Sequence, residues 1–277
     1  MSADPTTLTG VPATMLLTVA ARALAPTARP DLGFRDPCAE RIVAQLGVDP
    51  AQLCSGEALL VGTVARSLTL DRIARAFFAR HPDGLAINLG CGLGTNFDRI
   101  ADAVGAGCQW LDVDLPDVVA IRRRFFADGD QRRILEGDVC EATLCASLLA
   151  SERPTLIVAE GLLYYLPPAD VEALFRRLAA AANARAVPLE IAFDFASPSG
   201  VELSNRLNVD VNRSGARFLW GLSAPDALRA WDPKLTVVEM TGWKEALPEP
   251  YAAMFADLEQ RDGILPAATL HLRRSNA

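Results

Sequence analysis

Residues 86–100 read AINLGCGLGTNFDRI and join a short apolar run to three closely spaced glycines. The first four residues predict a buried strand, which leads into Gly90, Gly92 and Gly94. From Phe97 onward, apolar residues recur at helical spacing. A strand, a glycine-rich turn and a helix in this order are typical of the ligand-binding turn of an α/β sheet. A plain tight turn is the alternative.

The glycine spacing departs from the G-x-G-x-x-G dinucleotide fingerprint, because Thr95 stands where its third glycine would fall. Such a turn suits a ligand that lies over the backbone without placing a pyrophosphate on the helix N-terminus. Asp114 and Asp138 end the next two predicted strands, where carboxylates can accept hydrogen bonds from a ribose and from an adenine amino group. The pattern predicts an adenosine site, for NAD or for S-adenosylmethionine.

Strands and helices alternate from residue 84 onward, which argues for a mostly parallel sheet with helices on both faces. The predicted strands are 84–89, 108–113, 132–136, 154–159, 187–194, 234–239 and 268–273. Clear helical patterns cover 115–127 and 167–184, and a short helix is expected from Pro225.

Composition limits the classes of partner. The 277 residues carry a formal net charge of −7, which argues against nucleic acid. The apolar stretch 11–25 contains Arg22 and is shorter than the ~18 residues of a membrane span, so we expect an amphipathic helix and no membrane partner. Six cysteines without a C-x-x-C pair indicate buried free thiols in a reducing cytoplasm and no metal site.

Four stretches resemble the leucine carboxyl methyltransferase family, closest to its bacterial branch. They read NLGCGLGT (88–95), WLDVDLPDVVAIRR (110–123), LIVAEGLLYYLPPADVEALFRRLA (156–179) and FLWGLSAPDALRAWDPKL (218–235). The resemblance, from about residue 14 to 245, implies the class I methyltransferase fold, an α/β fold whose seven-stranded sheet has its last strand antiparallel. It also implies S-adenosylmethionine as methyl donor, with S-adenosylhomocysteine as product, and a carboxylate or hydroxyl as acceptor.

We therefore expect a single methyltransferase domain over 1–277. Residues 1–80 would form a helical N-terminal cap, and 81–194 with 226–277 a Rossmann-like core. The polar, irregular segment 195–225 would be a lid inserted over the substrate, because long inserted loops of this kind often bind ligands.

The resemblance implies roles for individual residues. Arg66 would pair with the methionine carboxylate of the cofactor, and Glu160 would help to bind its ammonium. Asp114 would hold the ribose, and Asp138 the adenine. The full cofactor set is Arg66, Gly90, Cys91, Gly92, Asp114, Leu115, Asp138, Val139 and Glu160, and the catalytic candidates are Tyr165, near the transferred methyl group, and Tyr164. Relatives often carry Asp-Thr-Arg at positions 94–96, so the bonding around this turn is expected to differ here.

Several of these residues have a purely structural alternative. Arg66 could be a surface ion pair and Glu160 a helix cap, and the two tyrosines could be ordinary core aromatics. Asp112 points to the same side of its strand as Asp114, which we favour because it lies at the strand end. For Asp194 we favour a cap or loop hydrogen bond over contact with substrate or a metal.

The substrate-binding candidates are three arginines of the predicted lid, Arg206, Arg213 and Arg217. An arginine there could form a bidentate pair with an anionic substrate, although a solvated arginine is the alternative. No Asp-Asn pair follows Asp194, so a metal-independent reaction is expected.

Histidine is scarce, which bears on the acceptor. His81 precedes the first predicted strand, and His271 falls in the last one, so neither is placed to act as a base. A carboxylate is already ionised at neutral pH and needs no base, whereas a phenol or alcohol benefits from one. We therefore predict an O-methyltransferase acting on a small-molecule carboxylate, polyketide-like or another secondary metabolite, as monomer or homodimer. Alternatives are a hydroxyl acceptor, an NAD-dependent oxidoreductase and a non-catalytic adenosine-binding protein.

Overall fold

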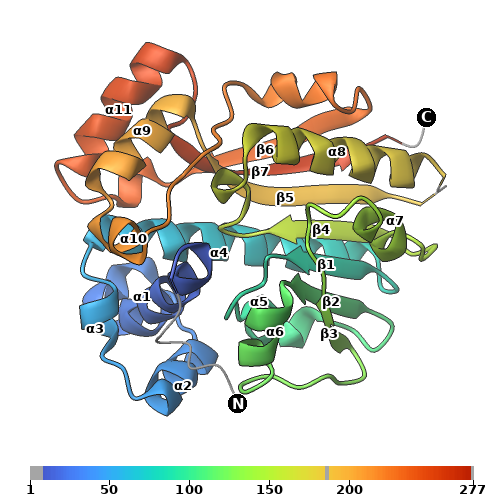
Figure 1. Cartoon of the computed structure of the whole chain (residues 1–277), viewed down its shortest axis with the longest axis horizontal. Helices are drawn as coiled ribbons and strands as arrows, with labels where there is room; N and C mark the ends of the chain where they lie inside the picture. The colour runs from blue at the N-terminus through green and yellow to red at the C-terminus, as the bar shows by residue number, and fades with distance from the viewer. Residues whose placement is uncertain (1–8, 185–186, 276–277) are drawn as a thin grey trace.

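A seven-stranded sheet in the order β3-β2-β1-β4-β5-β7-β6 forms the centre of the computed structural model (Figure 1). The structure describes residues 9–184 and 187–275, so the expectations for 1–8, 185–186 and 276–277 lie outside the described residues. The strands are β1 Leu85–Leu89, β2 Gln109–Asp114, β3 Arg132–Glu136, β4 Thr155–Ala159, β5 Leu189–Ala196, β6 Leu235–Gly242 and β7 Ala267–Arg274. Among the described strands, β7 alone runs against the direction of the other six, which confirms the predicted mostly parallel sheet.

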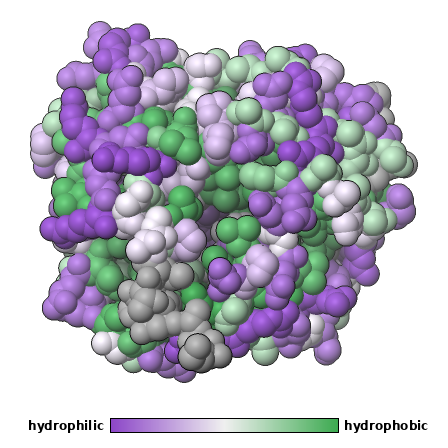
Figure 2. Space-filling view, in the orientation of Figure 1, coloured by the Kyte–Doolittle hydropathy of each residue, from purple (hydrophilic) through white to green (hydrophobic). Residues whose placement is uncertain are grey.

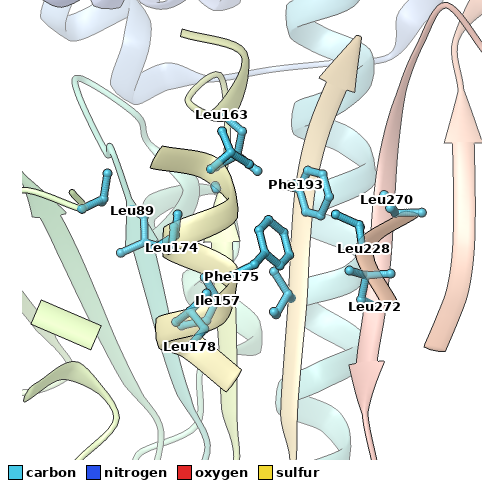
Figure 3. Close-up of a cluster of buried hydrophobic side chains, with 14 of the residues drawn as sticks. Leu89, Ile157, Leu163, Leu174, Phe175, Leu178, Phe193, Leu228, Leu270 and Leu272 are labelled. Atoms are coloured by element: carbon cyan, nitrogen blue, oxygen red, sulfur yellow. The ribbon is translucent and has the colours of Figure 1, made fainter. Parts of the chain in front are cut away.

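Helices cover both faces of the sheet, because successive side chains of a buried strand point to opposite sides. On β4, Ile157 packs with α8 (Pro168–Asn183), whereas Leu156 packs with α4 (Glu57–Arg80) on the other face. Figure 3 shows side chains of α8, among them Phe175, between that helix and the strands. The shorter α6 (Pro116–Arg122) and α7 (Leu144–Leu148) complete the described βα units.

From residue 9 onward, four α-helices precede the first strand. They are α1 (Thr14–Ala28), α2 (Pro37–Leu46), α3 (Pro50–Leu53) and the long α4. Asp36 and Asp49 cap the second and third by accepting hydrogen bonds from the N–H groups of Ala39 and Ala51.

The first of these helices is more apolar than the sequence analysis allowed. Val11–Ala28 is long and apolar enough to cross a membrane by length and composition alone. Half of that segment is buried inside the protein, where α1 packs against α2, α3 and α4. A buried core helix of a globular domain passes the same test.

Three segments differ from expectation. The helix after the glycine turn is a single turn, α5 (Asn96–Arg99), followed by the 3₁₀ turn η4 (Ala101–Ala103). The segment 195–225 is not irregular, since it holds α9 (Pro198–Leu207) and α10 (Val209–Ser214). Helix α11 (Tyr251–Asp262) was not expected at all. Ser197 caps α9 by accepting a hydrogen bond from the N–H of Gly200, and the serine followed by Pro198 was the available sequence signal for this helix start.

A buried ion pair holds the glycine turn on the sheet. The Arg122 guanidinium of α6 donates to Asp112 Oδ2 at 2.6 Å, and both side chains are 1% exposed. Its other terminal nitrogen donates to the carbonyls of Gly92 and Gly94 at 2.9 and 2.8 Å. Asn88 also donates to Asp112. Asp112 is therefore a structural anchor of the turn.

Arg122→Met should lower the free energy of unfolding by about 3–5 kcal/mol, because it leaves the Asp112 carboxylate buried without its countercharge. Urea unfolding at neutral pH measures this. Arg176→Met is the matched control, because Arg176 pairs with Glu172 on the exposed side of α8, and its loss should cost about 0.5 kcal/mol or less. Equal costs for the two variants would contradict the anchoring role of Asp112.

Candidate active site

A cavity of about 590 Å³ lies at the carboxyl ends of β1, β2, β4 and β5. Gly90 and Gly92, which line it, have φ values of +65° and +47°. A Cβ at Gly90 would come within 2.8 Å of Leu162, and one at Gly92 within 3.2 Å of Met15. These glycines are needed both for their left-handed backbone and for the close approach of two apolar side chains. In Figure 2 the surface is hollowed near its centre, with hydrophobic residues at the border.

Asp114 lies at the end of β2 and lines the cavity. Its Oδ2 accepts from the N–H of Gly92 at 2.7 Å and its Oδ1 from the N–H of Leu115 at 2.8 Å. A carboxylate has about four lone-pair sites, so two hydrogen bonds leave both oxygens able to accept further ones. Burial raises the pKa of this carboxyl, and the two backbone N–H groups oppose the rise.

Asp138 follows β3 and lines the same end of the cavity as Asp114. One of its oxygens accepts from the N–H of Cys140 at 2.8 Å, which fixes the carboxylate at the end of the strand. Val139, Cys91 and Leu115 also line the cavity. The whole predicted cofactor set therefore borders one space.

Glu160 follows β4 and lies in a buried cluster of charges. Its Oε1 accepts from Ser67 at 2.8 Å and from Arg66 Nε at 3.3 Å, and its Oε2 accepts from Asn96 at 2.7 Å. Arg99 Nη2 lies 3.9 Å from Oε2. Burial alone would raise the pKa of Glu160, but attraction to Arg66, Arg99 and Arg22 outweighs it and lowers the pKa to about 2.

Arg66 connects this cluster to β5. Its Nη1 donates to Tyr164 Oη at 2.7 Å and lies 3.2 Å from Asp194 Oδ2. Asp194 Oδ1 also accepts from the N–H of Gly161 at 2.6 Å, which is the loop hydrogen bond we predicted. Its pairing with Arg66 was not foreseen. The described residues contain no group of three or more side chains able to hold a metal ion.

Three aromatic rings border the charged cluster. Tyr164 stacks on Phe218 at 4.1 Å between ring centroids and meets Tyr165 edge to face at 4.8 Å. Burial raises the pKa of Tyr165 to about 12 and also raises the pKa of Tyr164 well above its usual range. Both phenols stay protonated at neutral pH. The two tyrosines lie in the cavity wall, as the sequence suggested, with hydroxyls that can donate hydrogen bonds.

The far end of the cavity is apolar and comes from three distant stretches of chain. Its side chains include Leu59 of α4, Leu203 of α9, Phe218, Trp243, Tyr251 and Phe255. The sequence analysis missed the last three. Aromatic residues at 251 and 255 have the i, i+4 spacing of one helix face, which was the available signal.

The three predicted substrate arginines are not in the site. Arg206, Arg213 and Arg217 are exposed and do not line the cavity. Arg217 donates to the carbonyl of Asn205 and to Asn212, which ties α9 to α10. The segment lines the cavity with its apolar side, and a helix that buries an apolar face turns its arginines to solvent.

Two buried residues of the site were missed. Arg22 of α1, which is 2% exposed, lines the cavity, lies 3.2 Å from Asp36 and donates to the carbonyl of Leu93. A charge inside an apolar run was the signal, because such a residue needs a buried partner. Asn96 lies in the turn sequence 94–96, which differs from that of relatives, and its side-chain amide donates a hydrogen bond to Glu160 Oε2.

Neither histidine lines the cavity. His271 is buried in β7 with Nε2 2.8 Å from Glu190 Oε2, and His81 is the C-cap residue after α4, before β1 begins. Both placements agree with the sequence prediction.

Comparison with known proteins identifies the class of enzyme. Residues 15–179 match the family model described as leucine carboxyl methyltransferase. Over 89% of this chain and 87% of the relative, 32% of residues are identical to the tetracenomycin polyketide synthesis O-methyltransferase TcmP of Streptomyces glaucescens. The S-adenosyl-L-methionine-dependent methyltransferase dpfgK of Gibberella zeae is 28% identical over 83% of this chain and 81% of its own.

The fold has counterparts among solved structures. Magnesium protoporphyrin IX methyltransferase from Synechocystis PCC 6803, determined with bound S-adenosylhomocysteine, superposes with a TM-score of 0.51 at 14% identity, over 92% of this chain and 98% of that one. At this identity the likeness shows the fold alone, which is the class I methyltransferase fold. The chain belongs to the leucine carboxyl methyltransferase family and is an S-adenosylmethionine-dependent methyltransferase.

Proposed function

We propose that this enzyme transfers the methyl group of S-adenosylmethionine to the carboxylate of an apolar, aromatic small molecule. The acceptor would be a polyketide-like compound or another secondary metabolite. The observation that carries the proposal is the absence of a usable base among the described residues that line the cavity. The relative named for tetracenomycin polyketide synthesis supports the metabolite class.

The residues at the sheet end of the cavity fit S-adenosylmethionine. When bound, this cofactor supplies a methyl group already activated on a sulfonium. Asp114 would accept hydrogen bonds from the ribose, and Asp138 would hold the adenine amino group. Arg22 and Arg66 would attract the methionine carboxylate, and Glu160 the ammonium. The charges of the buried cluster support this assignment. Three arginines (22, 66, 99) face four carboxylates (36, 71, 160, 194). S-adenosylmethionine carries a sulfonium, an ammonium and a carboxylate, so its net positive charge is favourable beside this cluster.

The ionisable side chains near the acceptor end do not suit proton abstraction. Tyr164 and Tyr165 have raised pKa values. Asp194 already binds Arg66 and the N–H of Gly161, and Asp210 accepts three hydrogen bonds. A carboxylate acceptor needs no base, because it is ionised above about pH 5. A hydroxyl acceptor, the alternative, would need one of these groups to be released.

Cap and lid would close the cavity from water. Asp210 of α10 accepts from the N–H groups of Ser55 and Gly56 at 3.0 and 2.9 Å and from Ser55 Oγ at 2.6 Å. The N–H of Gly10 donates to the carbonyl of Ser214 at 2.7 Å. We propose that these bonds hold the 195–225 segment as a lid against the N-terminal cap. Alignment of acceptor and methyl group, with exclusion of water, would then supply most of the acceleration. We also propose that the enzyme is cytoplasmic. We propose separately that the reaction needs no metal ion, so turnover should be unchanged when a chelator is added.

Asp114→Asn should weaken binding of S-adenosylhomocysteine by about 10–100-fold, because charge-assisted hydrogen bonds to the ribose are lost. The asparagine side chain also has only one accepting oxygen, whereas both oxygens of Asp114 accept from backbone N–H groups. Calorimetric titration measures the affinity. Asp117→Asn, at an exposed position in the first turn of α6, is the control and should bind normally. Normal affinity in Asp114→Asn would exclude the ribose assignment.

The pH dependence of turnover separates the two acceptor classes. With 2-naphthoic acid, kcat/KM should stay flat from pH 6 to 9, because the acid is already ionised and Tyr165 and Glu160 titrate near 12 and 2. With 2-naphthol, kcat/KM should rise about tenfold per pH unit below the phenol pKa of about 10. Efficient, pH-independent turnover of 2-naphthol with none of 2-naphthoic acid would refute the carboxylate proposal.

A further inference from the structure

Three partly exposed aromatic side chains at the apolar end of the cavity, Trp243, Tyr251 and Phe255, form what we call the distal aromatic group. In the part of the chain that the structure describes, no aromatic ring packs against any of the three. The three rings beside the charged cluster, by contrast, pack against one another. Ring surface that can stack on a ligand is therefore present at the apolar end.

Helix α11, which carries two of these rings, is unusually exposed. No residue of Tyr251–Asp262, which the structure describes in full, is buried. A helix of a globular domain ordinarily buries one apolar face. In α11 the rings of Tyr251 and Phe255 share a face, pack only in part against the hydrophobic cluster of α1 and α4, and border the cavity. A ligand that covers this face would remove apolar surface from water, which is favourable.

Trp243 rests on the side of α4 that lines the cavity. Its indole nitrogen lies 3.5 Å from where a Cβ of Gly62 would be, and Gly62 lines the cavity between Leu59 and Arg66 on one helix face. Leu59 packs against the cluster that contains the two tyrosines, and also against the cluster on which the distal aromatic group packs. Leu59 therefore separates the distal aromatic group from the tyrosines beside the charged cluster.

We propose that Trp243, with Tyr251 and Phe255, selects acceptors built of several aromatic rings by stacking on the rings furthest from the carboxylate. The inference rests on the proposed function and narrows its class of acceptor. The reacting carboxylate would lie at the charged end, and the molecule would extend past Leu59 to the distal aromatic group. An acceptor with one ring ends before this group and gains nothing from it.

Trp243→Leu tests this, because it keeps an apolar side chain and removes the ring. The probes are benzoic, 2-naphthoic and anthracene-2-carboxylic acids, each with its matched phenol. Methyl transfer from labelled S-adenosylmethionine at low acceptor concentration gives kcat/KM. In the wild-type protein, kcat/KM should rise by about tenfold or more from the one-ring to the three-ring acid. In Trp243→Leu this three-ring to one-ring ratio should fall by about fivefold or more.

Two further variants and one binding measurement separate selection from a structural role. Phe255→Leu should lower the same ratio. Phe125→Leu is the matched control and should leave it unchanged, because Phe125 is half-buried and does not line the cavity. Calorimetry should give an affinity for S-adenosylhomocysteine within about twofold of wild type in all three variants. An affinity that fell as far as the ratio, in both Trp243→Leu and Phe255→Leu, would overturn the selective role.

Failure of the inference differs from failure of the proposed function. Equal kcat/KM for the one-ring and three-ring acids in wild type, or an unchanged ratio in both cavity variants, would overturn the inference and leave the carboxylate acceptor standing. Wild-type protein that methylates phenols but no acid would overturn the carboxylate proposal, and the ratio among the phenols would then decide the role of the distal aromatic group. Protein saturated with S-adenosylhomocysteine that binds none of the six probes would overturn both.

Discussion

The site depends on one buried carboxylate, Glu160, which stays ionised because three arginines surround it. Each charge would be costly to bury alone, and the cluster is favourable only with every partner in place. The arginines come from α1, α4 and α5, and Glu160 from the end of β4. The same electrostatic condition therefore sets the position of the N-terminal helices, the glycine turn and the sheet relative to one another.

The two aspartates of β2 show how structure and binding are divided between neighbouring positions. Both lie on one side of the strand, but Asp112 is enclosed beneath the turn by Arg122 and Asn88. Asp114, one pleat further on, meets only backbone N–H groups and keeps free lone pairs toward the cavity. Because Arg122 and Asp112 hold the turn in place, the Asp114 carboxylate has a fixed position, which the proposed hydrogen bonds to a ribose would need.

The half of the site assigned to the cofactor could be predicted because its signals are local. A glycine turn after a strand, and acidic residues where Asp114 and Asp138 end successive strands, follow from chain order in a parallel sheet. The acceptor half could not, since Leu59, Leu203 and Phe255 meet only through the tertiary fold. Apolar residues that line a cavity have the same periodicity as those that fill a core, and exposed arginines such as Arg213 look in sequence like candidate ligands.

The two halves are mechanically joined through α4. Asp210 of the 195–225 segment accepts from the N–H groups of Ser55 and Gly56 just before this helix begins, and Arg66 holds Glu160 about two and a half turns further along it. Phe218, from the same segment, stacks on Tyr164, whose hydroxyl accepts from Arg66. If the 195–225 segment opens as the proposed lid to admit an acceptor, the contacts of Asp210 or Phe218 have to break, and Phe218 is connected to Arg66 through Tyr164. Under the lid proposal, entry of the acceptor would therefore be coupled to the arrangement of the charged cluster, because Phe218 of the segment and Tyr164 line the same cavity.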